Sequence, residues 1–95
     1  MKVRFNGRAR ADLFAQLDWL EHRSRDAALR AADQISSIVI QLGEFPESGP
    51  LIDDQNREVT VRFGRDGFVL RYRLDQEGVV IVRLYHGRQA RHEPT

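Results

Sequence analysis

The chain has 95 residues, of which 41% are hydrophobic and 31% charged, and this balance is typical of one globular domain covering residues 1–95. It contains no cysteine, which excludes disulfides, cysteine-based metal sites and thiol nucleophiles. No run of residues resembles a signal peptide or is apolar enough to cross a membrane, so we expect a cytoplasmic protein without a membrane partner.

The formal net charge is only +1, but the charges are unevenly distributed. Residues 1–30 contain seven basic and four acidic groups, and residues 57–91 contain eight basic and four acidic groups. Residues 31–56 between them contain five acidic groups and no basic one. All basic groups but Lys2 are arginines, whose planar fork pairs with a carboxylate or a phosphate through two hydrogen bonds. This bipolar pattern fits an acidic protein partner at least as well as nucleic acid.

The first elements predicted along the chain are a short strand and an amphipathic helix. Residues 2–5 alternate in character and predict a strand, which Asn6 and Gly7 end. Residues 8–23 carry apolar side chains at helical spacing and predict a helix. To the stripe of this helix that faces the core we assign Ala9, Leu13, Phe14, Leu17 and Leu20.

Trp19 lies well outside this stripe, near the opposite side of the predicted helix. A tryptophan there either packs against the next helix or anchors a partner, because tryptophan is enriched at binding hot spots. We therefore count Trp19 among the predicted partner contacts.

A second, more regular helix is predicted over residues 27–42, after a turn at residues 24–26. Gly43 is a plausible end for this helix. The short turn predicts that the two helices pair as an antiparallel hairpin. The apolar stripe of the second helix consists of Ala28, Ala31, Ala32, Ile35, Ile38, Val39 and Leu42.

Residues 44–56 contain two prolines and a glycine and predict a loop. The spacing of its carboxylates does not match that of a calcium-binding loop. We therefore expect a solvated acidic loop and no metal site. The carboxylates concerned are Glu44, Glu47, Asp53 and Asp54.

Three strands with short connections are predicted to follow, over residues 57–63, 68–74 and 79–85. Their connections of three or four residues predict an antiparallel meander. The last strand begins with residues that are apolar on both faces, as in a central strand. The predicted fold is α+β with the order β-α-α-β-β-β, in which a helical hairpin packs on one face of a twisted, mainly antiparallel sheet.

The face without helices is expected to carry arginines. Arg71 and Arg73 share one face of their strand, and Arg83 and Tyr85 share one face of the last strand. The chain then continues through "RLYHGRQAR", residues 83–91, in which Gly87 permits a sharp exit from the sheet. Basic and titratable groups thus gather where the last strand ends.

Six segments in this order resemble the RelE/ParE superfamily, the toxins of bacterial type II toxin–antitoxin pairs, with ParE-type toxins the closest. The segments are "ARADL", "ALRAADQI", "L..FPESG", "RE..V", "VLRYRL" and "VVIVRLYHGR". The resemblance implies the same β-α-α-β-β-β fold, no cofactor, and a hetero-oligomeric complex with a cognate, ParD-like antitoxin that has a flexible tail. For ParE-type toxins it implies growth arrest through inhibition of DNA gyrase, and for RelE-type toxins cleavage of mRNA in the ribosome.

The residues at the family's site positions favour the ParE branch. RNase members commonly carry a basic side chain where this chain has Val69, and often a tyrosine beyond the last strand, whereas no tyrosine follows Tyr85. One feature favours the RNase branch instead, because "YHG" resembles the "YHY" of a histidine-using group of RNases. In that alternative, His86 would transfer a proton, with Arg83 or Arg88 as the cation.

These patterns predict two binding sites and no catalytic residue in the ParE interpretation. The alternative enzyme would use His86, Arg83 and Arg88, and the additional proton carriers on offer are Glu58 and His92. The predicted antitoxin contacts are Trp19, Arg71, Arg73 and Arg83. The predicted target contacts are Arg83, Tyr85, His86, Arg88 and Arg91.

Overall fold

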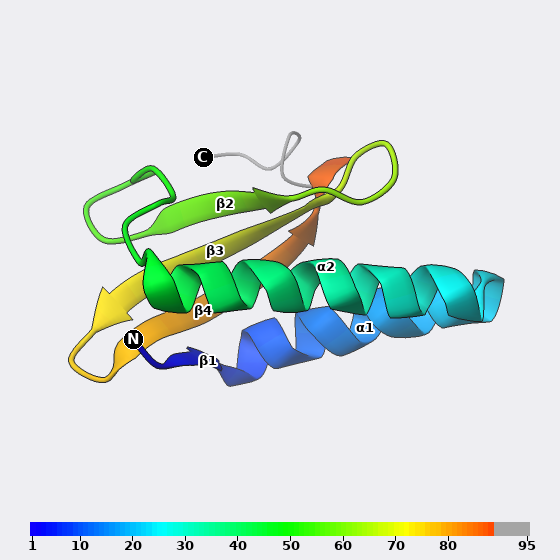
Figure 1. The fold of residues 1–95 in the computed structure, drawn as a ribbon, viewed down its shortest axis with the longest axis horizontal. Helices are drawn as coiled ribbons and strands as arrows, with labels where there is room; N and C mark the ends of the chain where they lie inside the picture. Colours follow the sequence, from blue (N-terminus) through cyan, green and yellow to red (C-terminus); the bar gives the residue numbers. More distant parts are fainter. Residues whose placement is uncertain (89–95) are drawn as a thin grey trace.

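The computed structural model describes residues 1–88, and its elements follow the order β1, α1, α2, β2, β3, β4 (Figure 1). This order and the packing of two helices on one four-stranded sheet confirm the predicted α+β fold. The elements are β1 Val3–Phe5, α1 Gly7–Arg23, α2 Arg25–Glu44, β2 Arg57–Val61, β3 Phe68–Asp75 and β4 Gly78–His86.

The sheet has the strand order β1-β4-β3-β2, which makes β4 an inner strand. β1 pairs in parallel with β4, and the two other pairs are antiparallel. The first strand thus lies beside residues from the far end of the chain, with Val3 opposite Val79. The apolar start of β4 is buried on both faces, as its sequence predicted.

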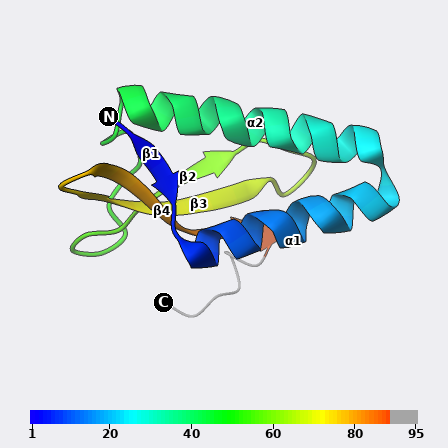
Figure 2. The same cartoon turned by 90° about the horizontal axis from the view of Figure 1, so that it is seen from below.

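The two helices form an antiparallel hairpin that covers one face of the sheet (Figure 2). Asn6 caps α1 by accepting a hydrogen bond from the Ala9 N–H at 2.9 Å, and Ser24 caps α2 by accepting one from the Ala27 N–H at 3.1 Å. The turn between the helices was predicted to span residues 24–26, but it consists of Ser24 alone, because α1 ends at Arg23 and α2 begins at Arg25. Neither described helix offers the long apolar stretch that a bilayer crossing requires.

The prediction that Gly43 ends the second helix is wrong by one residue. The Phe45 N–H donates to the Gln41 carbonyl at 2.7 Å, so the helical pattern extends to Glu44. Gly43 instead gives room to the first residue of the chain. A Cβ at Gly43 would lie 3.0 Å from the Met1 carbonyl oxygen, and the Met1 ammonium group donates to the Gly43 carbonyl at 2.6 Å.

The core lies between the helical hairpin and the sheet. The assignment of Phe14 to the apolar stripe is wrong, since this side chain is 63% exposed. Successive helix positions differ by about 100°, so Phe14 points outward when Leu13 points into the core. The buried core residues are Ala9, Ala31, Ile35, Leu42, Val61, Phe68, Leu70, Tyr72, Val79, Ile81 and Leu84.

A β-bulge in β4 decides which side chains share a face at the end of the sheet. The register between β3 and β4 shifts between Arg71 and Tyr72, and the pairing skips Val82. One extra residue reverses the alternation of side chains in the rest of the strand. Val79 and Ile81 face the helices before the bulge, and after it the residues on this side are Leu84 and His86.

Candidate binding face and strand end

The bulge gathers arginines on the face of the sheet that no described helix covers. Arg71 and Arg83 lie opposite each other in the register, and Tyr85 follows on the same face as Arg83. Arg73 extends the row along β3. We call this helix-free surface of Arg71, Arg73, Arg83 and Tyr85 the arginine face. An unbroken alternation in β4 would have pointed Arg83 into the apolar core instead.

Two arginines of this face flank one aromatic ring. The guanidinium carbons of Arg83 and Arg71 lie 4.6 and 5.1 Å from the centroid of the Tyr85 ring, within the range of cation–π interaction. The Arg83 Nε donates to Asp12 of α1 at 2.8 Å, and the Arg71 Nε donates to Glu58 of β2 at 2.9 Å. Tyr85 is buried, so its contribution to a contact surface comes through the arginines beside it.

The other end of the same face carries a second charged pair. Arg4 of β1 binds Asp75 of β3 through both terminal nitrogens. The hydrogen bond from Arg4 lowers the pKa of Asp75, and the carboxylate raises the pKa of Arg4 in turn. Arg73 between these two groups is exposed and forms no ion pair with any residue in the described part of the chain.

His86 lies on the opposite face, although it follows Tyr85 directly. Its ring meets the Phe68 ring edge to face, with the centroids 6.2 Å apart and an interplanar angle of 88°. Its Nδ1 accepts a hydrogen bond from the Arg88 N–H at 3.2 Å. Arg83 and His86 therefore point to different sides of the sheet, as do Glu58 and His86.

The chain leaves the sheet through Gly87, which has no room for a side chain. The Gly87 N–H donates to the Gly67 carbonyl at 2.9 Å, and a Cβ at Gly87 would lie 1.8 Å from the Asp66 carbonyl oxygen. The side chain of Arg88 is 67% exposed, with its Nε 3.9 Å from an Asp66 carboxylate oxygen. Two further residues of the predictions, Arg91 and His92, lie outside the described residues.

Trp19 is accessible on the surface of α1. Its residue surface is 54% exposed, and the guanidinium carbon of Arg23 lies 4.1 Å from the centroid of the indole ring. An exposed tryptophan stacked by an arginine has the accessibility that a partner anchor requires. Its role in binding the antitoxin stays a prediction.

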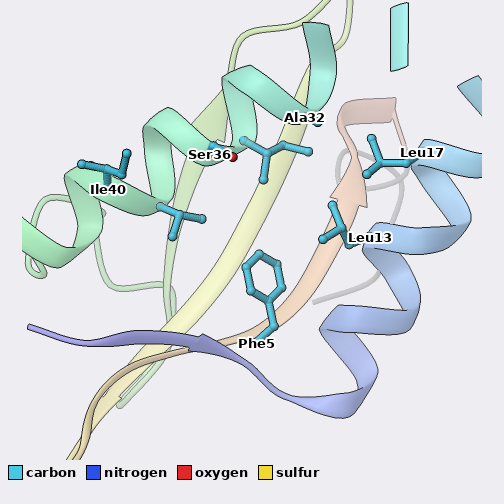
Figure 3. A pocket seen from close by; sticks show the side chains of 8 residues that line it. Phe5, Leu13, Leu17, Ala32, Ser36 and Ile40 are labelled. Atoms are coloured by element: carbon cyan, nitrogen blue, oxygen red, sulfur yellow. The ribbon is translucent and has the colours of Figure 1, made fainter. Parts of the chain in front are cut away.

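An apolar groove lies between the two helices and β1 (Figure 3). It is on the helix-covered side of the sheet, and the arginine face is on the other side. The groove has a volume of about 350 Å³, and Ile40 on its rim is 64% exposed. This groove was not predicted, because the apolar stripes of both helices were assigned to the core. Three consecutive apolar residues at positions 38–40 were the available signal, since a helix cannot bury all three on one side. The groove is lined by Phe5, Leu13, Leu17, Ala32, Ile35, Ser36, Val39 and Ile40.

The acidic loop between α2 and β2 is organised by its own hydrogen bonds. Asp53 accepts from the side-chain amide of Asn56 at 2.9 Å and from the backbone N–H groups of Gln55 and Asn56. These bonds, led by that from the Asn56 side chain, lower the pKa of Asp53. Within residues 1–88, no three acidic or histidine side chains are grouped as metal ligands would be.

Comparison with known proteins assigns this arrangement to a toxin family. The family model described as the ParE toxin of the type II toxin–antitoxin system parDE matches residues 3–91. Toxin RelE3 of Caulobacter vibrioides is 39% identical over 89 residues, which are 94% of this chain and 97% of that toxin. Toxin RelE1 of the same organism is 32% identical over 84 residues, which are 88% of this chain and 90% of that toxin. The chain therefore belongs to the ParE toxin family of type II toxin–antitoxin systems, within the RelE/ParE superfamily.

Proposed function

We propose that this protein is a ParE-like toxin that inhibits DNA gyrase by binding to it, and that a ParD-like antitoxin neutralises it. The target contacts come from the arginine face and from the end of β4, where Arg88 is exposed. The protein contributes a charged surface in this mechanism and carries out no bond-breaking step itself.

The observation that carries the proposal is the distribution of the candidate catalytic groups over two faces. RNA cleavage needs a proton carrier and a cation at the same phosphate, within hydrogen-bond reach of the reacting atoms. Arg83 lies on the arginine face beside Tyr85 and binds Asp12 of α1, whereas His86 lies on the helix side against Phe68. This separation favours a surface that recognises a partner over a site that cleaves RNA.

The antitoxin is proposed to hold the toxin from both sides. A toxin of a type II pair has a cognate antitoxin, and the apolar groove between the helices suits the apolar face of an antitoxin helix. Acidic residues of its tail would then pair with Arg73, which is exposed on the arginine face. Trp19 would add an aromatic contact on the flank of α1.

A second candidate function is a RelE-like mRNA interferase. It is favoured by the names of the relatives, Toxin RelE3 and Toxin RelE1. It is also favoured by the position of His86, whose Nδ1 contacts the backbone of the exposed Arg88. In this alternative, Arg88 would supply the cation.

The deciding experiment compares the two targets directly, with toxin released from its antitoxin complex. One reaction contains gyrase and supercoiled plasmid, and the other contains ribosomes translating a defined mRNA. We expect accumulation of gyrase-cleaved plasmid, which His86→Gln leaves intact and Arg88→Ala weakens. Codon-specific cuts in the mRNA that disappear in His86→Gln, with gyrase unaffected, would overturn the proposal and establish the interferase. In that case the loss should be roughly 10²–10⁴-fold, the usual effect of removing a general acid or base.

A further inference from the structure

Each of the two arginines beside Tyr85 is held by a carboxylate from a different element. Asp12 of α1 binds Arg83, and Glu58 of β2 binds Arg71 through both Nε and a terminal nitrogen, at 2.9 and 2.8 Å. The two carboxylate side chains are only 16% and 24% exposed. Partly buried, charge-assisted hydrogen bonds of this length are stronger than those of exposed ion pairs.

Asp12 also fixes the backbone of the strand that carries Arg83. The contact of the N-terminal segment with β4 ends where the Asn6 N–H donates to the Ile81 carbonyl. Beyond this point, no strand formed by residues 1–88 neighbours β4 on that side. The carboxylate of Asp12 takes the place of a neighbouring strand, since the oxygen atom that binds Arg83 also accepts a hydrogen bond from the Leu84 N–H at 2.9 Å. One carboxylate group thus holds both the side chain of Arg83 and the backbone of Leu84.

This arrangement removes freedom from the arginines before any partner arrives. A free arginine loses much rotamer entropy when it is immobilised at an interface, and preorganisation reduces that loss. The carboxylates bind the guanidinium groups at Nε, and the Tyr85 ring supports them from the side. The two guanidinium planes are therefore set relative to each other by three separate elements, α1, β2 and β4.

We propose that Asp12 and Glu58 are positioning residues for target recognition, which hold Arg83 and Arg71 against Tyr85 as one rigid pair. The pair would meet an anionic group of the target. This inference rests on the proposed role of the arginine face in target binding. If the carboxylates act through the arginines, removing a carboxylate should have no further effect once its arginine is gone.

The test is a pair of double-mutant cycles with growth arrest as the readout. Toxin is expressed from a titratable promoter in cells without antitoxin, and the toxin level at half-maximal arrest is measured by immunoblot. One cycle combines Asp12→Asn with Arg83→Ala, and the other combines Glu58→Gln with Arg71→Ala. The control is Asp26→Asn, because Asp26 forms a salt bridge with Arg30 that is largely exposed on α2.

Each carboxylate substitution should raise the required toxin level roughly tenfold, the typical effect of losing a charge-assisted hydrogen bond. In the Arg83→Ala or Arg71→Ala background it should change nothing further, and Asp26→Asn should change nothing in any background. Equal losses with and without the arginine, or no loss from either carboxylate, would overturn the inference. Melting temperatures of the purified variants exclude a simple loss of fold, and if Asp12→Asn unfolds, the Glu58 cycle decides alone.

Growth arrest reports toxicity whichever molecule is the target. The coupling can therefore be measured even if the wild-type toxin leaves gyrase unaffected and the proposed function fails. Conversely, gyrase inhibition by the wild type together with additive losses would refute only the positioning role.

Discussion

Ile40 provides a direct test of the groove as the docking site for the antitoxin. Its side chain lies on the rim of the groove and is 64% exposed in the free toxin. Complete burial of an isoleucine contributes about 1.5–3 kcal/mol, so burial of the exposed two-thirds contributes about 1–2 kcal/mol to binding. Ile40→Ala should remove most of this contribution and raise the Kd of the antitoxin complex about 5–30-fold. Ile40→Asp should raise it further, because it places a charge against an apolar lining.

The Kd is measured by calorimetry with purified toxin and antitoxin at fixed salt. The matched control is Leu29→Ala, since Leu29 is also on α2, is 59% exposed and does not line the groove. Neither alanine substitution should change the free energy of unfolding of the free toxin by more than about 0.5 kcal/mol. Wild-type affinity in Ile40→Ala, or an equal loss in Leu29→Ala, would refute the docking site.

Three further predictions test the fold and the strand end. Ile35→Asp places an unpaired charge at a core position that is 3% exposed, which costs at least several kcal/mol of folding free energy. Thermal melting followed by circular dichroism should therefore show no cooperative unfolding transition, and a transition like that of the wild type would contradict the assignment of Ile35 to the core. Gly87→Ala forces a Cβ against the Asp66 carbonyl, and should lower both the melting temperature and the toxicity. The control is Gly7→Ala, which should lower neither, because a Cβ at Gly7 meets no atom within 4 Å and this residue is helical. Because Arg4 lowers the pKa of Asp75, this carboxylate stabilises the fold above its unfolded pKa, and the stabilisation disappears as the pH falls through the folded pKa. Arg4→Ala should therefore reduce the acid dependence of the melting temperature below about pH 4, and an unchanged profile would contradict this pairing.

The elements of this fold could be predicted from the sequence because each has a strong local pattern. The apolar stripe at positions 28–42 has the period of a helix, and the short turns after residues 63 and 74 favour a meander. Even the inner position of β4 was predictable, since only a strand covered on both faces begins with four apolar residues. Errors arose at boundaries, as at Gly43, where a contact with the distant Met1 decides which residue is needed.

The candidate site could be predicted only as a set of residues. Which of them share a face depends on the bulge at Val82, and local sequence gives no reason for a bulge there. Asp12 is a similar case. It lies one turn from Ala9 on the buried side of α1, so its carboxylate requires a cationic partner. The sequence does not show which arginine this is, because Arg83 is 71 residues away and only one of many arginines. Long-range pairing of this kind follows from the assembled topology.

The parallel pairing of β1 with β4 has a consequence for how the toxin forms. The hydrogen-bond partners of residues 3–5 lie at residues 79–81, so almost the entire described chain must be present before the first strand can join the sheet. A growing chain that has not reached Gly78 can form the helical hairpin. It still lacks β4, the inner strand against which the hairpin packs. Domains rich in contacts so distant in sequence fold slowly. The arginine pair needs α1, β2, β3 and β4 together, so a partially synthesised toxin that has not reached Arg83 does not yet carry it.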